Sequence, residues 1–177
     1  LFIVNVDWFF VSHRLPIALE ALKSGYEVHI ACQFTDKFDY LSSLGFKLYP
    51  LTLSRSGTSL RSELATILEV FKLTKQINPD VVHMVTIKPV IYGGIVSRIL
   101  RVKQRVASIS GLGYVFIAQG LKYKFLRTAV ALLYRFALRR HDTDVIFQNP
   151  NDRDLFIYLG IIRAEQATMI RGSGVDL

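Results

Sequence analysis

The sequence predicts one α/β domain that is doubly wound around a mostly parallel sheet. Short apolar runs alternate with longer segments in which apolar residues recur at helical spacing, as in strand–helix–strand units of parallel sheets. The 177 residues are 51% hydrophobic, which is enough for one sizeable core. No internal repeat and no interdomain linker interrupts the alternation. We therefore expect residues 1–177 to form a single domain.

The first half of the chain begins with an apolar run that is typical of a strand. Ser12 can cap the helix that follows, and Gly25 is placed to end it. The helix expected at Leu60–Gln76 has an amphipathic 3.6-residue period and is stopped by Asn78-Pro79-Asp80. In chain order we expect a strand at Leu1–Val6, a helix from Ser12 to near Gly25, a strand at Tyr26–Cys32, a helix at Thr35–Leu44, a strand at Phe46–Leu51, a loop at Leu53–Thr58 and a helix at Leu60–Gln76.

The second half continues the alternation. We expect a strand at Val81–Val85, a helix at Val90–Leu100, a strand at Arg105–Ile109, a helix over about Lys122–Arg140, a strand at Asp144–Phe147, a helix at Asn151–Tyr158 and a strand near Thr168–Ile170, before a turn at Gly172-Ser173-Gly174. Asn149 precedes a proline and is expected to cap its helix. This order predicts a Rossmann-like domain, in which ligands bind at the carboxyl ends of the strands.

Composition narrows the class of protein. A net charge of +8 is typical of chains that bind nucleic acid, anionic membranes or phosphorylated ligands. The single cysteine, Cys32, excludes an internal disulfide and fits a reducing compartment. No Cys or His pair has metal-ligand spacing, so we expect no metal site. The longest uncharged stretch, Val106–Leu121, is too short and too rich in glycine to span a membrane. The chain starts inside an apolar run without Met and with no signal peptide, so the native protein is expected to begin a few residues earlier.

The segment after the first strand contains three aromatic residues, Trp8, Phe9 and Phe10, and no glycine. A dinucleotide-binding enzyme would carry G-x-G-x-x-G here, so a dehydrogenase is disfavoured. The aromatic residues are equally typical of core or lid packing. His13 and Arg14 form a basic pair at a predicted helix N-terminus, which suits an anionic ligand.

Two other strand ends carry candidate site residues. His83 can exchange a proton near neutral pH and Lys88 can balance phosphate charge, although a core histidine and a solvated lysine are the alternatives. After the fifth predicted strand, Ser110 is followed by Gly111 and Gly113, which permit close backbone approach to a ligand or merely a sharp turn. No Ser-His-Asp triad and no close carboxylate pair is recognisable from spacing, which argues against a hydrolase.

The helix over Lys122–Arg140 contains no acidic residue. Four basic residues fall on one stripe, and a wide opposite face is apolar. A stripe of one sign suits an anionic lipid surface or a lipid-linked phosphate, whereas a core-packed helix with a solvated face is the alternative. Nucleic acid is a weaker partner, because no aromatic residues alternate with the charges. The stripe is Lys124, Arg127, Arg135 and Arg139, and the apolar face is Phe125, Leu126, Ala129, Leu132, Leu133, Phe136 and Ala137.

Five strings occur in an order that resembles the N-terminal half of a family-four retaining glycosyltransferase of bacterial capsule, O-antigen or N-glycan assembly. The resemblance covers essentially the whole chain. The strings are Ser12-His13-Arg14-Leu15-Pro16, Lys88-Pro89-Val90-x-Tyr92-Gly93-Gly94, Ser110-Gly111-Leu112-Gly113-Tyr114-Val115-Phe116, Phe147-Gln148-Asn149 and Gly172-Ser173-Gly174-Val175-Asp176.

The resemblance implies the GT-B architecture of two facing Rossmann-like domains. It implies that this half mainly receives the acceptor, often a sugar on undecaprenyl diphosphate at the cytoplasmic face of the membrane. A second domain after Leu177 is expected to bind the nucleotide-diphosphate sugar, so this chain alone is expected to be inactive. No cofactor and no metal is implied. The protein is expected to be cytoplasmic and peripheral on the inner face of the cell membrane.

The resemblance also gives the candidate residues their roles. It implies that His13, Arg14 and Lys88 bind anionic groups, that His83 orients an acceptor hydroxyl, and that the loop at Ser110–Gly113 lines the cleft. Relatives often carry His where Ser110 stands. The expected reaction is transfer of a hexose or N-acetylhexosamine to a lipid-linked glycan. The alternative is a non-catalytic membrane-docking subunit that binds the acceptor and recruits a separate donor-binding chain.

Overall fold

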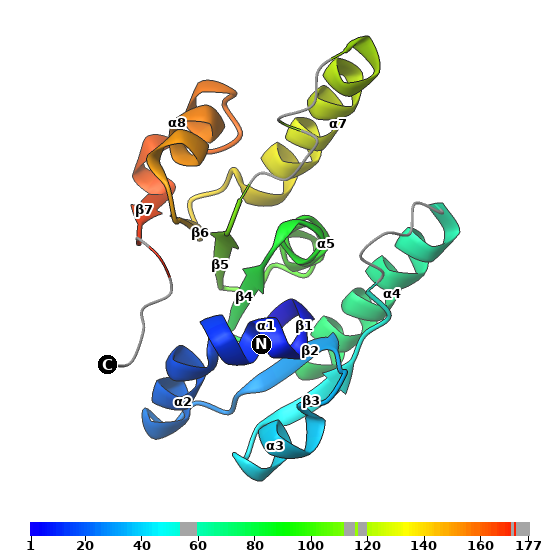
Figure 1. Ribbon diagram of the computed structural model, residues 1–177, viewed down its shortest axis with the longest axis vertical. Coiled ribbons are helices and arrows are strands. Elements are labelled where there is room, and N and C mark those ends of the chain that lie inside the picture. Colours follow the sequence, from blue (N-terminus) through cyan, green and yellow to red (C-terminus); the bar gives the residue numbers. More distant parts are fainter. Residues whose placement is uncertain (54–59, 112–115, 117–119, 171, 173–177) are drawn as a thin grey trace.

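The computed structural model describes residues 1–53, 60–111, 116, 120–170 and 172 (Figure 1). These residues form one seven-stranded sheet of order β3-β2-β1-β4-β5-β6-β7, in which every neighbouring pair is parallel. The predicted Rossmann-like α/β class is therefore confirmed. The strands are β1 Phe2–Val6, β2 His29–Gln33, β3 Lys47–Pro50, β4 Val81–Val85, β5 Gln104–Ile109, β6 Thr143–Phe147 and β7 Ala167–Met169.

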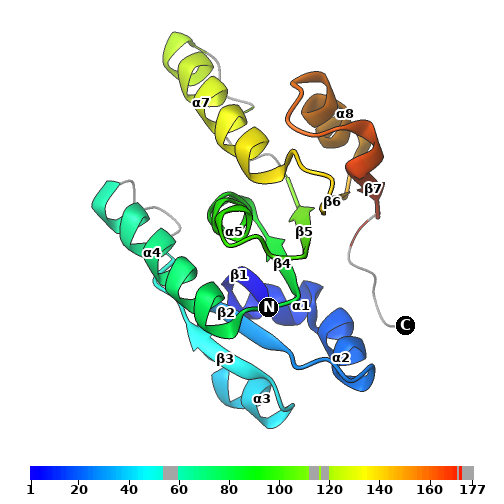
Figure 2. The ribbon, with the colours of Figure 1, turned by 180° about the vertical axis from the view of Figure 1, so that it is seen from behind.

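Helices cover the sheet from both sides because the strand order reverses between β1 and β4. Alternate residues of β1 show the two layers: Phe2 and Val4 belong to the buried cluster that includes residues of α1 and α2, whereas Ile3 belongs to the cluster that includes residues of α5 and α7. Figures 1 and 2 show α1 and α2 on one side of the sheet and α4, α5 and α7 on the other. The helices are α1 Asp7–His13, α2 Leu15–Lys23, α3 Phe38–Ser43, α4 Leu60–Ile77, α5 Ile87–Ile99, α7 Leu121–Leu138 and α8 Pro150–Tyr158, with the short 3₁₀ turn η1 Ala164–Gln166.

The glycine pair of α5 has a packing role. A Cβ at Gly93 would lie 2.9 Å from Cγ of Met84, and one at Gly94 would lie 2.8 Å from Cβ of Ala137. Both distances are shorter than side-chain atoms tolerate, so the two glycines let α5 approach β4 on one side and α7 on the other.

The segment after β1 corrects one prediction. The residues between the predicted first strand and the predicted helix start at Ser12 are helical, and Ser12 lies inside α1 rather than capping the next helix. Its hydroxyl donates to the carbonyl of Trp8, 3.0 Å away and one turn earlier. The physical reason is a stabilised first turn: the buried carboxylate of Asp7, the first residue of α1, accepts the backbone N–H of Trp8, which has no partner within the helix.

The position of α7 corrects another expectation. Most of its predicted apolar face is exposed, and the helix packs instead through Tyr134, Ala137 and Leu138. Elsewhere the expected elements are present with shifted ends, and Asn149 caps α8 as predicted by accepting from the N–H of Asp152. Within the described residues, no helix is long and apolar enough to cross a membrane.

Candidate functional site

Three neighbouring strands end in polar side chains at the carboxyl edge of the sheet. Asn5 lies in β1, Thr86 follows β4 and Ser110 follows β5. In the described part of the chain, Oδ1 of Asn5, Oγ1 of Thr86 and Oγ of Ser110 are all buried without a hydrogen-bond partner. Leaving such a group unpaired costs about 1–3 kcal/mol. Three of them at the ends of neighbouring strands, at the switch point of a parallel sheet, indicate a site for a ligand with hydroxyl or phosphate groups.

Thr86 is also strained. Its φ of +77° lies in a region that favours glycine, and a β-branched residue is especially costly there. The conformation turns the chain from β4 directly into α5, whose first hydrogen bond runs from the N–H of Val90 to the carbonyl of Thr86. Strain of about 1–3 kcal/mol is typical of functional positions. Neither Asn5 nor Thr86 is among the site residues predicted from the sequence, although Asn5 is the polar residue of an otherwise apolar strand.

Lys88 lies in the first turn of α5, next to this edge, and its charge is balanced. Its ammonium lies 2.6 Å from Oε1 of Glu63 in the first turn of α4, and the hydroxyl of Tyr92 donates to the other carboxylate oxygen. Burial alone raises the pKa of Glu63, but the hydrogen bonds from Lys88 and Tyr92 outweigh it and lower that pKa. Glu63 therefore stays ionised, and any anion that reaches Lys88 competes with it.

His13 and Arg14 occupy the junction between two short helices. His13 is the last residue of α1, so its predicted place at a helix N-terminus is wrong, whereas Arg14 immediately precedes α2. The His13 ring stacks on Phe9 with centroids 4.1 Å apart. Arg14 is buried, donates to the carbonyl of His13 at 2.7 Å, and its Nε has no partner among the described residues. Burial lowers the pKa of Arg14.

His83 lies in the middle of β4, two residues before the strand ends. It is buried, its ring stacks on Phe2, and its Nε2 lies 2.8 Å from the hydroxyl of Ser108. Burial, followed by the charge of Arg14, lowers the pKa of His83 to about 3. The imidazole is therefore neutral at pH 7, so it can share a hydrogen bond but carries no charge for a phosphate.

Of the remaining loop residues, Gly111 has a φ of +152°, and a Cβ there would meet no described atom within 4 Å, so the close approach of backbone to a ligand stays a prediction. Gly113 lies outside the described residues, as does the Gly172–Asp176 string apart from Gly172. Among the residues that the structure describes, no group of three or more His, Cys, Asp or Glu is arranged to hold a metal ion.

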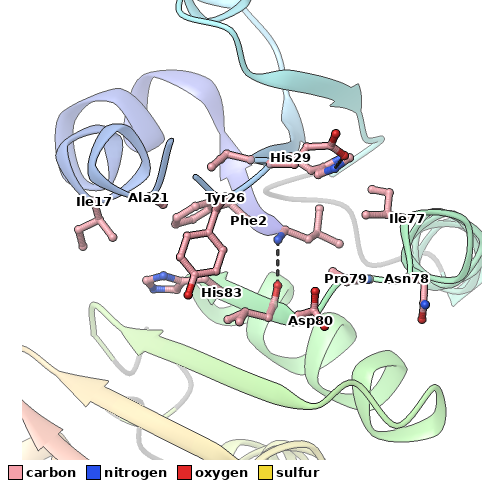
Figure 3. Close-up of a pocket in the computed structure, with 14 residues that line it drawn as sticks. Phe2, Ile17, Ala21, Tyr26, His29, Ile77, Asn78, Pro79, Asp80 and His83 are labelled. Carbon is pink, nitrogen blue, oxygen red and sulfur yellow. Dashed lines mark hydrogen bonds and ion pairs between the residues drawn. The ribbon is translucent and has the colours of Figure 1, made fainter. Parts of the chain in front are cut away.

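A cavity of about 390 Å³ lies at the opposite, amino edge of the sheet (Figure 3). Its lining includes Leu1, Phe2, Tyr26, Val81 and His83, and the dashed line in Figure 3 joins the amino group of Leu1 to the carbonyl of Val81. The cavity is mainly apolar and lies away from the three unpaired polar groups. We place the candidate site at the carboxyl edge, where those groups and the strained Thr86 lie.

The basic stripe of α7 divides in two. Lys124, Arg127 and Arg135 line a groove of about 330 Å³ that α7 forms with Leu159. Arg139 instead donates to the carbonyl of Gly160 at 2.9 Å and so ties α7 to the end of α8. Three of the four residues predicted to face a membrane thus share one surface.

Comparison with known proteins gives one family match and several matches of fold. The model of the glycosyl transferase 4-like family matches residues 1–149. The N,N'-diacetylbacillosaminyl-diphospho-undecaprenol alpha-1,3-N-acetylgalactosaminyltransferase of Campylobacter jejuni is 25% identical over 165 residues, which are 93% of this chain and 43% of that protein. The chain therefore spans less than half the length of this relative.

Solved structures share the fold at lower identity. UDP-GlcNAc 2-epimerase from Methanocaldococcus jannaschii superposes with a TM-score of 0.65 at 15% identity, over 97% of this chain and 45% of that one. HepE from Anabaena, in complex with UDP, superposes with a TM-score of 0.60 at 20% identity, over 99% of this chain and 44% of that one. Because the first of these is an epimerase, the fold alone does not select the reaction.

Proposed function

Because the chain belongs to the glycosyl transferase 4-like family, we propose that it is the N-terminal, acceptor-side domain of a two-domain glycosyltransferase. The enzyme would move a hexose or N-acetylhexosamine from a nucleotide-diphosphate sugar to a lipid-linked glycan. Two relatives support this choice: the Campylobacter jejuni protein is named for an undecaprenol-linked acceptor, and HepE was solved with UDP. The domain that binds the donor would lie outside these 177 residues.

The observation that carries the proposal is the row of unpaired polar groups at Asn5, Thr86 and Ser110. A sugar presents several hydroxyls that both donate and accept, which matches one amide oxygen and two hydroxyls held on adjacent strands. The strain at Thr86 holds its hydroxyl at this edge before the ligand arrives, which reduces the ordering that binding requires.

The basic residues and His83 are proposed to have two further roles. His13, Arg14 and Lys88 are proposed to bind the anionic part of the substrates, with Lys88 exchanging Glu63 for a phosphate oxygen. The proposed role of His83 is to orient the acceptor hydroxyl as a neutral imidazole, acting through Ser108. We expect Lys88→Ala and His83→Ala to lower turnover of the complete enzyme at least tenfold, and unchanged rates would remove both from the site.

The matched test uses Thr86→Val and Thr86→Ser in the full-length protein. Valine keeps the branched shape and the backbone strain but removes the hydroxyl, whereas serine keeps the hydroxyl. Transfer would be measured from UDP-hexoses and UDP-N-acetylhexosamines to a short-chain undecaprenyl-diphosphate glycan analogue. We expect valine to lower kcat/KM at least tenfold, about the 1–3 kcal/mol of one buried hydrogen bond, and serine to stay within about threefold of wild type.

Wild-type kcat/KM in Thr86→Val would contradict the site. Tight binding of the acceptor without transfer from any donor would contradict the enzymatic assignment and favour an acceptor-binding subunit. Because the proposed acceptor is lipid-linked, we also propose that the protein acts in the cytoplasm, on the inner face of the cell membrane.

A further inference from the structure

One side of α7 is apolar and exposed over most of the helix. Phe125 is 80% exposed, Leu132 61% and Phe136 47%, and Leu126 and Leu133 belong to the same surface. Phe125, Leu132 and Phe136 are seven and four residues apart, and Leu126 and Leu133 are seven apart, so these side chains form a stripe along one side of the helix. Large apolar side chains that are exposed in series mark a surface that another phase or molecule covers.

Cations lie on both sides of this stripe. On the α8 side are Lys124, Arg127 and Arg135, which line the groove with Leu159. On the α5 side, the guanidinium of Arg98 lies 4.2 Å from the centroid of the Phe136 ring and donates to the carbonyl of Phe136. The sequence of α7 contains no Asp or Glu. We call this combination the apolar–basic face of α7.

We propose that the apolar–basic face of α7 inserts into an anionic lipid surface. The Phe and Leu side chains would enter the boundary between headgroups and acyl chains, while the cations on either side bind lipid phosphates. A second copy of this chain fits the face poorly, because it would bring like charges together along both sides of the stripe. A lipid surface of uniform negative charge complements Arg98 on one side of the stripe and the three cations on the other side at once.

The location of α7 relates this face to the proposed acceptor. In the described part of the chain α7 lies between β5 and β6, so its N-terminal end is at the carboxyl edge of the sheet, as are Thr86 and Ser110. Figures 1 and 2 show α7 projecting beyond the sheet with that end outermost. The inference rests on the proposed function here: an inserted α7 would hold the site near the lipid to which an acceptor sugar is attached.

The first experiment reports insertion directly. Leu132→Cys in the full-length protein would be labelled with an environment-sensitive fluorophore, since the native Cys32 is buried. The matched control is Tyr158→Cys on α8, where the native side chain is 86% exposed. With vesicles of phosphatidylglycerol and phosphatidylcholine, we expect a blue shift at position 132 and none at 158. Equal shifts at both positions, or no shift at 132, would overturn insertion.

The second experiment separates the apolar and the ionic contributions by flotation with the same vesicles. We expect Phe125→Ser combined with Leu132→Ser to weaken binding at least tenfold. Lys124→Gln and Arg127→Gln should each weaken vesicle binding about fivefold, and only on anionic vesicles. The control, Lys23→Gln, alters an exposed lysine of α2 and should bind as wild type. Thermal unfolding at the wild-type temperature would confirm that each variant is folded.

Other outcomes separate the alternatives. Loss of vesicle binding in soluble pyrophosphate, with Phe125→Ser and Leu132→Ser binding as wild type, would mean phosphate recognition alone and overturn insertion. Self-association that the serine pair abolishes, without vesicle binding, would make the face a contact between copies. Transfer to a water-soluble acceptor analogue is independent of docking. If the protein binds vesicles but does not transfer a sugar to this analogue, the proposed function is refuted, whereas the proposed docking surface is not.

Discussion

The carboxylate of Asp7 offers the clearest test of how this sequence builds its site. Asp7 is fully buried and accepts five hydrogen bonds. Four come from the backbone N–H groups of Trp8, Thr35, Asp36 and Lys37, and the fifth from the hydroxyl of Thr35. The side chain thus stabilises the first turn of α1 and also holds the segment between β2 and α3. We expect Asp7→Asn to destabilise the fold without changing its shape.

The magnitude follows from these contacts. An asparagine has one acceptor oxygen. The better orientation puts this oxygen in the place of Oδ2, which accepts three backbone N–H groups in the wild type. The NH₂ group of the asparagine then faces the N–H of Trp8. One buried N–H is then unpaired, at about 1–3 kcal/mol, and the bonds that remain lose the extra strength of a charged acceptor, about 1 kcal/mol each at most. We expect a loss of about 3 kcal/mol in the free energy of unfolding, a large part of the 5–15 kcal/mol that is typical of a domain.

The same residue predicts a pH dependence. Burial alone raises the pKa of Asp7, but the hydrogen bonds from Thr35, Lys37 and Trp8 more than offset it, so the pKa in the folded protein is below its ordinary value. The stabilisation is therefore complete above the unfolded pKa of about 3.9 and is lost as pH falls through the folded pKa. The wild type should lose its advantage over Asp7→Asn in that acidic range.

Urea unfolding of both proteins, followed by circular dichroism at pH 7 and at several pH values below 4, measures this difference. A difference under about 0.5 kcal/mol at pH 7, within the range of ordinary surface substitutions, would show that the five contacts are not energetically coupled to folding. A difference that stays constant down to the acid transition would refute the assignment of the charge to Asp7.

Two further predictions concern packing and buried charge. Gly94→Val should lower the free energy of unfolding by about 1–3 kcal/mol in urea, because its Cβ would meet that of Ala137 at 2.8 Å and force α7 outward; an unchanged urea midpoint would contradict the close contact. Asp142→Asn should cost about 3–5 kcal/mol, because it leaves the buried guanidinium of Arg105 without its anion. Asp80→Asn, at an exposed ion pair, is the control and should cost less than about 1 kcal/mol in the same assay; equal costs would refute the argument from burial.

The fold could be predicted because the information for it is local. Apolar runs and helical periods locate the strands, and Val81–Val85 is β4 to the residue. Alternation of strands with helices implies parallel pairing, since each crossover returns the chain to the same edge. The second strand was expected to begin at Tyr26 but begins at His29, because Tyr26 is exposed and only the later residues pair with β1.

The site could be predicted only in part, because its contacts are distant in sequence. Lys88 was identified from its place after a strand, but its partner Glu63 is on a different helix and has no local signature. The helical start at Asp7 depends on N–H groups beyond residue 34. Similarly, the periodicity of α7 identifies an apolar side, but it cannot say whether the protein core or another phase covers that side.

The two proposals follow from opposite kinds of exposure. At the carboxyl edge, Asn5, Thr86 and Ser110 bury polar atoms without partners in the described structure, whereas α7 exposes large apolar side chains. Each arrangement costs free energy in the isolated domain, and a different environment relieves each cost: a sugar with its hydroxyls for the first, and a lipid boundary for the second. A ligand that is a sugar at one end and a lipid at the other meets both requirements. The proposed lipid-linked acceptor would therefore explain features of this chain that its fold, which an epimerase shares, does not.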